Sequence, residues 1–196
     1  HTIIVKSTVV PLTTEEVVMP NILKKSGWKR ENLGIGMNPE FLREGSAIDD
    51  AQNPDRIVIG FADEIARKTL NELYEPYKCT KLECSPRTAE LIKYASNSFL
   101  ATKISFVNEI ANMSNIWGID FQEVAEGMGL DSRISSEFLR AGAGFGGSCF
   151  PKDVKALAAA AKNSKVESLM LKATLEVNDI QPKIIVKMAE DRLGVI

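Results

Sequence analysis

The sequence is poor in histidine and cysteine, and each shortage excludes a class of chemistry. The single histidine is His1, so a catalytic site inside the chain has to work without a histidine base or a histidine-bound metal. The three cysteines include no Cys-x-x-Cys pair, and an odd number argues against both a disulfide framework and a zinc site. We therefore expect no metal, and a reducing, cytoplasmic setting.

The sequence also lacks a charge surplus and a long hydrophobic run. Lysine and arginine total 24 against 26 acidic residues, so the net charge of −2 offers no basic surface for nucleic acid or an anionic membrane. The longest run of small apolar residues, 156–161, is far shorter than the roughly 20 residues of a membrane-spanning helix. No charged-then-apolar leader opens the chain. We expect neither nucleic acid nor a membrane as a partner.

Strands and helices are predicted to alternate through residues 1–85. The expected strands cover residues 2–10, 33–37, 56–60 and 80–84, and the expected helices cover residues 13–25 and 62–73. This alternation is typical of βαβ units and a parallel sheet. Because four strands make a thin sheet and a strand begins at the first residues, we expect the C-terminal half of a Rossmann-like domain, in a piece of a longer protein.

After Cys84 the pattern changes to nearly all helix. Ser85 and Pro86 are typical of an N-cap and a first helical residue, and the helix is predicted to reach about Trp117. Its buried stripe is expected to contain Ala89, Ile92, Ser96, Phe99, Lys103, Phe106 and Ile110.

Three further helices are predicted. They cover residues 121–128, 151–162 and about 166–192, and Pro182 either kinks or divides the last one. We assign residues 86–165 to a helical dimerisation domain and 166–196 to a long connecting helix. The predicted fold is therefore α/β followed by mainly α.

The segment Gly142 to Gly147 fits the pattern G-x-G-x-x-G, which is typical of dinucleotide-binding turns. That fingerprint needs a strand before it and an acidic residue about 20 positions later on the next strand. Here residues 135–140 are polar and helical in character, and a helix follows. We therefore do not read this segment as a dinucleotide-binding turn, and any cofactor site is only half contained in the chain.

The residues directly after the glycines carry more chemistry. If Pro151 is the first helical residue, Cys149 lies just outside the helix N-terminus, where unpaired N–H groups and the helix dipole favour a thiolate. Asp153 lies one turn further on, and Lys152 adds a positive charge. The alternative is a buried cysteine near a helix cap, with Asp153 as an ordinary first-turn acid.

Polar residues also occur at helical spacing in the long helix. Lys93 and Asn97 are four residues apart and share a face with Ala89 and Leu100, which would bury the lysine. A buried lysine needs an anion or loses its proton, and it can stabilise a developing oxyanion. The alternative is a lysine that extends its ammonium to solvent.

Two carboxylates follow the second predicted strand. Glu40 and Glu44 flank the apolar pair Phe41-Leu42, at the strand end where open parallel sheets bind ligands. Thr8 ends the first strand in the same topological position. Ordinary surface carboxylates in a loop are the alternative reading.

Together, four segments resemble the UDP-glucose/GDP-mannose family of nucleotide-sugar 6-dehydrogenases. The segments are Lys6-Ser7-Thr8-Val9-Val10-Pro11, Asn38 to Gly45, Lys93-x3-Asn97, and Gly144 to Asp153. Members of this family have an N-terminal NAD domain, a helical middle that dimerises and a C-terminal domain that binds the nucleotide. The resemblance implies that the G-x-G-x-x-G opening and nearly everything after the long helix are absent from this sequence.

The resemblance implies a two-step, NAD-dependent oxidation of a sugar CH₂OH group to a carboxylate. Cys149 would attack the intermediate aldehyde, and the resulting thiohemiacetal would be oxidised to a thioester and hydrolysed. Lys93 and Asn97 would hold the charge on the sugar oxygen. Asp153 and Thr8 would manage protons through an ordered water, and Glu40 would assist hydrolysis.

Further site residues follow from the same resemblance. Thr8, Glu44 and Lys152 would face the nicotinamide, and Arg133 would reach the substrate of a neighbouring subunit in a homodimer or higher homo-oligomer. The residues expected to contact the nucleotide sugar are Glu40, Phe41, Leu42, Lys93, Asn97, Arg133, Phe138, Leu139 and Gly146.

Substrate choice depends on few residues. Phe150 favours UDP-glucose over GDP-mannose, whose dehydrogenases tend to have leucine there, and Ser148 replaces the histidine usual for UDP-N-acetylmannosamine. Hydroxyacid dehydrogenases related to 6-phosphogluconate dehydrogenase have the Lys-x3-Asn helix but need no thiol, so Cys149 followed by Asp153 argues against them. The remaining alternative is a dimerisation core without activity, paired through Leu169, Ala173, Glu176 and Ile180.

Overall fold

The computed structural model describes residues 1–194, which form two compact units. The first unit spans His1–Ala95 and the second begins at Ser96, so helix α4 (Pro86–Trp117) contributes to both. This division falls inside α4, whereas the sequence-based boundary was placed where that helix begins. The predicted domain assignment itself stays a prediction.

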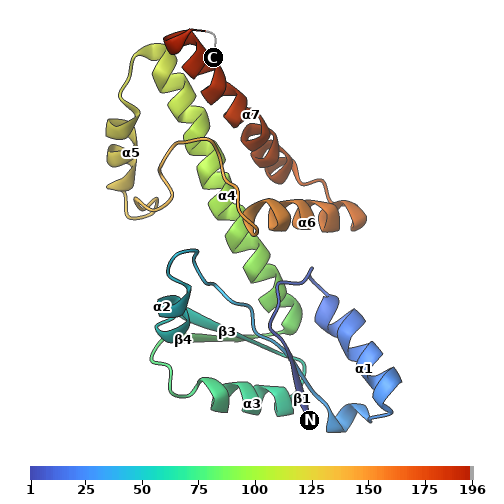
Figure 1. The fold of residues 1–196 in the computed structure, drawn as a ribbon. Helices are drawn as coiled ribbons and strands as arrows, with labels where there is room; N and C mark the ends of the chain where they lie inside the picture. The colour runs from blue at the N-terminus through green and yellow to red at the C-terminus, as the bar shows by residue number, and fades with distance from the viewer. Residues whose placement is uncertain (195–196) are drawn as a thin grey trace. The chain divides into compact units, whose positions relative to one another are not determined.

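The first unit contains a four-stranded mixed sheet in the order β1-β2-β3-β4 (Figure 1). The strands are β1 (Thr2–Val5), β2 (Gly34–Met37), β3 (Arg56–Phe61) and β4 (Thr80–Cys84). Strands β1 and β2 are parallel, with Val5 opposite Met37, and β3 and β4 are parallel, with Arg56 opposite Thr80. Strands β2 and β3 are antiparallel.

The prediction of a wholly parallel sheet is therefore wrong at its centre. A parallel connection needs a crossover segment, usually a helix that packs on the sheet. The connection between β2 and β3 contains only the six-residue helix α2 (Ala47–Gln52), and the chain returns in the opposite direction. Strand β1 is also shorter than predicted, because it ends at Val5 and residues 6–10 form a loop.

The two helices predicted for the first unit are present near their predicted ranges. Besides α2 and the start of α4, the helices of this unit are η1 (Thr14–Val18), α1 (Met19–Ser26), η2 (Arg30–Asn32) and α3 (Glu64–Tyr74). The first predicted helix consists of the consecutive elements η1 and α1, whereas η2 and α2 were not predicted. Helix α1 has Pro20 in its first turn and ends at Gly27, whose φ of 69° is in the left-handed region that glycine tolerates.

Alternate residues of β3 bury the two faces of the sheet. Ile57 and Ile59 pack with Leu70 of α3, whereas Val58 packs with Met37 and with Ala89 in the first turn of α4. This alternation follows from the two-residue period of a strand. Helix α3 and the start of α4 therefore cover opposite faces.

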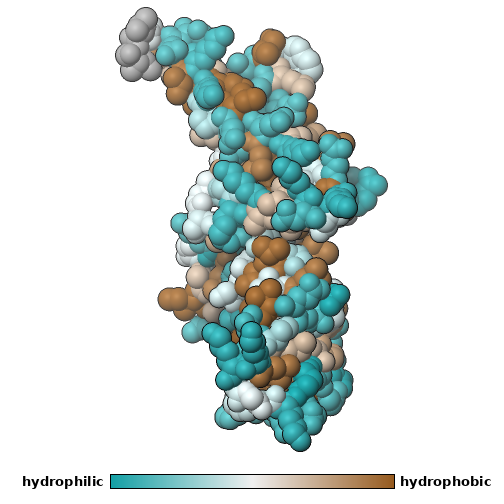
Figure 2. Space-filling view, turned by 90° about the vertical axis from the view of Figure 1, so that its right-hand side faces the viewer, coloured by the Kyte–Doolittle hydropathy of each residue, from teal (hydrophilic) through white to brown (hydrophobic). Residues whose placement is uncertain are grey.

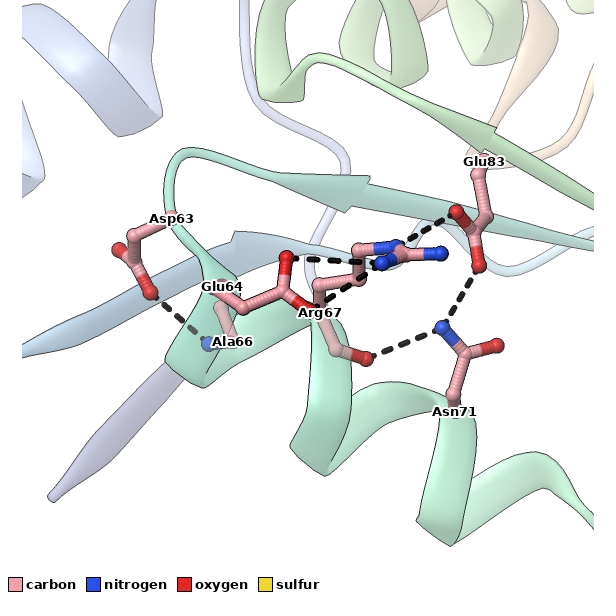
Figure 3. Close-up of polar contacts among 6 residues, drawn as sticks. All are labelled: Asp63, Glu64, Ala66, Arg67, Asn71 and Glu83. Atoms are coloured by element: carbon pink, nitrogen blue, oxygen red, sulfur yellow. Dashed lines mark hydrogen bonds and ion pairs between the residues drawn. The ribbon is translucent and has the colours of Figure 1, made fainter.

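Polar side chains fix α3 at its N-terminus and against β4 (Figure 3). Asp63 caps the helix, since its Oδ1 accepts from the N–H of Ala66 at 2.8 Å. The Glu83 carboxylate of β4 accepts from Arg67 Nε at 2.8 Å and from Asn71 Nδ2 at 2.7 Å. The hydrogen bonds from Arg67 and Asn71 lower the pKa of Glu83, so this link depends on an ionised carboxylate.

The second unit is helical. It contains α4 from Ser96 onward, α5 (Phe121–Gly129), α6 (Phe150–Asn163) and α7 (Leu169–Leu193). Helix α7 runs beside α4 (Figure 1), and Ser105 Oγ donates to the carbonyl of Thr174 at 2.8 Å. The core consists of Ala101, Phe145 and Val154 with partly buried neighbours. Pro182 lies inside α7 and does not divide it, so the predicted long helix is confirmed.

The predicted buried stripe of α4 is wrong at two aromatic positions. Phe99 is 66% exposed and Phe106 is 50% exposed. The buried polar residues of α4 are Glu90, Lys93, Asn97, Ser98, Ser105, Asn108 and Ser114. Several of these side chains are bonded to groups outside α4, which offsets the cost of their burial. The Glu90 carboxylate, for example, accepts from the N–H groups of Leu12 and Thr14.

Exposed apolar side chains are common in the second unit. Ile116, Trp117, Leu130 and Leu169 are each more than 60% exposed. The face drawn in Figure 2 shows separate hydrophobic patches among hydrophilic residues. Within residues 1–194, no helix combines the length and apolar character needed to cross a membrane.

Candidate functional site

The predicted site residues fall into two groups, one in each unit. Thr8, Glu40, Phe41, Leu42, Glu44 and Lys93 belong to the first unit, and Asn97, Arg133, Phe138, Leu139, Gly146, Cys149, Lys152 and Asp153 to the second. Lys93 and Asn97 nevertheless lie one turn apart on the continuous helix α4.

Lys93 is a buried cation with a carboxylate partner. Its side chain is 5% exposed, and its Nζ lies 2.9 Å from Oε1 of Glu40 and 5.4 Å from the ring centroid of Phe41. The ammonium therefore does not extend to solvent, which was the alternative reading. A cation placed in this way can stabilise negative charge that forms beside it.

Glu40 is held as a carboxylate by several donors. Its burial raises the pKa, but the N–H of Leu42 donates to Oε2 at 2.8 Å, and Lys93 adds a hydrogen bond and a positive charge. With the charge of Lys6, these interactions outweigh burial, and the pKa of Glu40 lies below its ordinary value. Glu40 is accordingly ionised at neutral pH and able to accept a proton or a hydrogen bond.

Asn38 links strands β1, β2 and β3, a role that sequence reasoning missed. Its N–H donates to the carbonyl of Val5 at 2.9 Å, and its Nδ2 donates to the carbonyl of Val58 at 2.8 Å. Its Oδ1 accepts from Lys6 Nζ at 2.7 Å and from the Tyr74 hydroxyl. In the sequence, the only indication of this role of Asn38 was its position directly before Pro39 at the end of a predicted strand.

The pKa of Lys6 is lowered. Burial is the largest cause and the charge of Lys93 adds to it, whereas the charge of Glu40 acts in the opposite direction.

The other predicted residues of the first unit lie in loops. Phe41 packs on the core, with the guanidinium carbon of Arg56 4.1 Å from its ring centroid. Leu42 is 44% exposed, and Glu44 is exposed in the turn before α2. Thr8 is half-buried in the loop after β1.

Cys149 is the N-cap residue of α6, close to the predicted position. Its carbonyl accepts from the N–H of Asp153 at 2.9 Å, its side chain is exposed, and its Sγ lies 3.7 Å from Ser148 Oγ. The alternative of a buried cysteine is therefore wrong. Cys79 and Cys84 are half-buried free thiols of the first unit, and burial raises the pKa of Cys84.

Asp153 is a buried carboxylate with a partner at each oxygen. It is 1% exposed, Oδ2 accepts from Asn97 Nδ2 at 2.6 Å, and Oδ1 pairs with the ammonium of Lys152. The alternative of an ordinary exposed first-turn acid is wrong. Burial of a carboxylate costs desolvation free energy, which these partners offset. Through them Asp153 fixes the amide of Asn97 and the first turn of α6, whose N-cap is Cys149.

The remaining predicted residues lie between α5 and α6. Leu139 is buried, and Phe138 has a positive φ of 64° and a ring centroid 6.3 Å from that of Phe150. Arg133 is exposed and pairs with Asp131 at 2.7 Å, and Gly146 is exposed in the glycine-rich loop.

Part of a cofactor site fits the first unit. The carboxyl ends of the parallel strands β1 and β2 lie side by side, and the loops that carry Thr8 and Glu40 begin there. Ligands of open α/β sheets bind at such strand ends. A ligand bound at this edge of the sheet would contact these loops. Within residues 1–194, no cluster of three or more His, Cys, Asp or Glu side chains could hold a metal ion.

Two models of one protein family match most of the chain. Residues 1–78 match the NAD binding domain, and residues 87–180 the central domain, of the UDP-glucose/GDP-mannose dehydrogenase family. The chain is 47% identical to the UDP-glucose 6-dehydrogenase AglM of Haloferax volcanii over 199 residues, covering 98% of this chain and 46% of that protein.

Two solved structures are also similar. One is a UDP-glucose dehydrogenase from the hyperthermophilic archaeon Pyrobaculum islandicum, with 46% identity and a TM-score of 0.95 over 99% of this chain and 44% of that chain. The other is the GDP-mannose dehydrogenase of Pseudomonas aeruginosa, with 40% identity and a TM-score of 0.66 over 92% of this chain and 42% of that chain. The chain thus spans a little less than half the length of these relatives.

Proposed function

Because the chain belongs to the UDP-glucose/GDP-mannose dehydrogenase family, we propose that its protein oxidises the C6 hydroxymethyl group of a nucleotide sugar to a carboxylate. Bound NAD⁺ would accept one hydride in each of two oxidation steps. The observation that carries the proposal is an exposed thiol at the start of α6, one turn before a buried carboxylate paired with Asn97.

Cys149 is the proposed nucleophile. After the first oxidation, its thiolate adds to the aldehyde carbon, and a C–S bond forms in a thiohemiacetal. Loss of a second hydride gives a thioester, water attacks the thioester carbonyl, and the C–S bond breaks to release the uronate and the thiolate. Each turnover therefore consumes one water and two NAD⁺ and releases two NADH and three protons.

Lys93 and Asn97 are proposed to bind the reacting oxygen. The Lys93 ammonium is buried, and a buried donor stabilises developing oxyanion charge more strongly than an exposed one. Asn97 donates one amide hydrogen to Asp153, which fixes its orientation and leaves a second N–H for a ligand.

Three acidic or hydroxyl-bearing residues are proposed to take part in proton transfer. Asp153 and Thr8 would act through an ordered water, and the ionised Glu40 would assist thioester hydrolysis as a base. Glu44 and Lys152, with Thr8, would face the nicotinamide. Arg133 would contact the substrate of a neighbouring subunit. Phe41, Leu42, Phe138, Leu139 and Gly146 would line the nucleotide-sugar site.

UDP-glucose is the substrate that we favour, and UDP-glucuronate the product. The named relatives at 46–47% identity act on UDP-glucose, and the GDP-mannose dehydrogenase structure is less similar in identity and TM-score. Phe150 directly after the cysteine supports the same choice. GDP-mannose and UDP-N-acetylmannosamine are the alternatives.

A homodimer or higher homo-oligomer in a cytoplasmic setting is also proposed. Several large apolar side chains of α4 and α7 are exposed in the second unit, including Phe99 and Met170. Self-association would bury such a surface. The free thiol of Cys149 fits a reducing compartment.

The test measures the products of the intact protein with NAD⁺ and each of the three nucleotide sugars. We expect two NADH per uronate, with the highest kcat/KM for UDP-glucose. One NADH per product, or no NADH with any of the sugars while the protein is folded by circular dichroism, would refute the proposal. Sedimentation of the 196-residue chain then distinguishes a dimerisation core from a monomer.

A further inference from the structure

The glycine-rich loop that leads to Cys149 has no regular secondary structure. Residues 141–149 contain neither helix nor strand, and Cys149 ends this segment as the N-cap of α6. The position of the thiol therefore depends on what holds the loop backbone. Where such a loop is buried, its N–H and C=O groups need hydrogen-bond partners, and side chains can supply them.

Asn178 of α7 binds both backbone groups of Phe145. The N–H of Phe145 donates to Asn178 Oδ1 at 2.6 Å, and Asn178 Nδ2 donates to the carbonyl of Phe145 at 3.1 Å. The Asn178 carboxamide thus supplies the donor and the acceptor that a neighbouring strand would otherwise offer to the Phe145 backbone. Gly144 permits this approach, because a Cβ there would lie 2.5 Å from Asn178 Oδ1 and its φ is 104°.

A second pair of carboxamides binds the loop at Gly142. Its N–H donates to Asn108 Oδ1 at 2.8 Å, and its carbonyl accepts from Gln181 Nε2 at 3.0 Å. Gln181 also accepts from Asn112 Nδ2 at 2.9 Å. Asn108 and Gln181 are both buried, so these bonds are shielded from competing water.

The position of Asn178 in α7 is matched to this role. Pro182 follows four residues later and has no N–H, so it cannot make the helical hydrogen bond to the carbonyl of Asn178. That carbonyl lies on the side of Gly144, because a Cβ on Gly144 would be 3.5 Å from it.

Packing connects the bound loop to the first turns of α6. The Phe145 side chain is buried in one cluster with Ala101 and Val154, and Val154 follows Asp153 directly. The ring of Phe145 also meets the ring of Phe150 edge to face, with centroids 6.2 Å apart. A shift of Phe145 would therefore displace the turn that carries Cys149 and Asp153.

We propose that Asn178 is a positioning residue for the Cys149 thiol, and that Gln181 supports it at Gly142. The inference rests on the proposed function, in which Cys149 is the nucleophile. In this proposal, α7 positions the nucleophile although none of its side chains takes part in the reaction. Loss of the Asn178 carboxamide frees both backbone groups of Phe145 and loosens the segment that ends at the sulfur.

The test compares Asn178→Ala with Asp179→Ala, a truncation of the exposed neighbouring residue on the same helix. Two readouts are used on the 196-residue chain: hydrogen exchange of the Phe145 amide, and the rate of Cys149 alkylation by iodoacetamide relative to Cys79 and Cys84. In Asn178→Ala we expect exchange at least about tenfold faster and relative alkylation at least about threefold slower. The loosened loop would hold Cys149 less of the time at the N-terminus of α6, where the helix dipole favours the reactive thiolate. Asp179→Ala should change neither.

An unchanged relative alkylation rate in folded Asn178→Ala would overturn the proposal, even if Phe145 exchanges faster. If Asn178→Ala does not fold, Asn178→Asp is tested instead. This variant keeps the acceptor for the Phe145 N–H and loses only the donor to the Phe145 carbonyl. This variant should show a smaller change of the same sign, and wild-type alkylation would again overturn the proposal. Neither readout requires substrate or NAD⁺, so failure of the positioning role and failure of the proposed oxidation are distinguishable.

Discussion

At the scale of single residues, the chemistry depends on charged groups that are buried with a partner. Lys93 meets Glu40, and Asp153 meets Asn97 and Lys152. Such pairs cost desolvation free energy, and the removal of one member leaves the other unpaired. Helical spacing could predict that Lys93 is buried, but not that Glu40 is the anion, because the two residues come from separate segments.

Substitution of Lys93 tests the proposed oxyanion role. Lys93→Ala removes the buried donor, and we expect kcat for uronate formation by the intact protein to fall about 10²-fold or more. Lys155→Ala, at an exposed position on α6, is the control and should leave kcat unchanged. Wild-type kcat in a folded Lys93→Ala protein would show that Lys93 is only a structural ion pair.

Acid should weaken the fold through Asp50. The hydrogen bonds from the side chain and backbone of Arg43 lower the pKa of Asp50 from 3.8 to about 2. Its carboxylate therefore stabilises the native state above about pH 4, and the contribution is lost as the pH falls toward about 2. The urea midpoint of Asp50→Asn should lie below that of the wild type at pH 6, and this difference should be much smaller at pH 2.5. An equal difference at both pH values would contradict this assignment, and Asp49→Asn at an exposed position is the control.

At the scale of elements, caps predicted helix ends well and composition predicted sheet direction poorly. Ser85-Pro86 and Pro151 correctly placed the starts of α4 and α6 within a residue. The antiparallel pairing of β2 with β3 could not be predicted. It depends on the three-dimensional path of the connection after Asn38, which the sequence pattern does not specify. The burial of Lys93 was predicted, but the other buried polar residues of α4, such as Glu90 and Ser105, were missed because apolar periodicity gives no signal for them.

The cap of α3 gives a quantitative test of local structure. Asp63→Ala removes the acceptor for the N–H of Ala66 and the ion pair with Arg30. We expect a loss of about 1–2 kcal/mol in the free energy of unfolding, measured with urea. Glu64→Ala, in the first turn but with a largely exposed side chain, should cost less. Equal losses in the two variants would rule out a special role for the cap.

At the scale of the whole molecule, the sequence motifs identified the family but not the supports of the site. Cys149, Asp153 and Asn97 are found from their neighbours along the chain. Asn178 and Gln181 lie 33 and 39 residues from the glycine-rich loop positions that they bind, and nothing in the local pattern joins them. Only the packing of α7 beside α4 brings them to the loop.

The reaction of a protein without its thiol tests the central claim of covalent catalysis most directly. Uronate formation by the intact protein with Cys149→Ser is measured against Cys84→Ser, which removes a half-buried thiol of the first unit. We predict that Cys149→Ser loses at least about 10³-fold in the rate of uronate formation while Cys84→Ser retains it. Uronate formation at the wild-type rate by the Cys149→Ser protein would contradict the account.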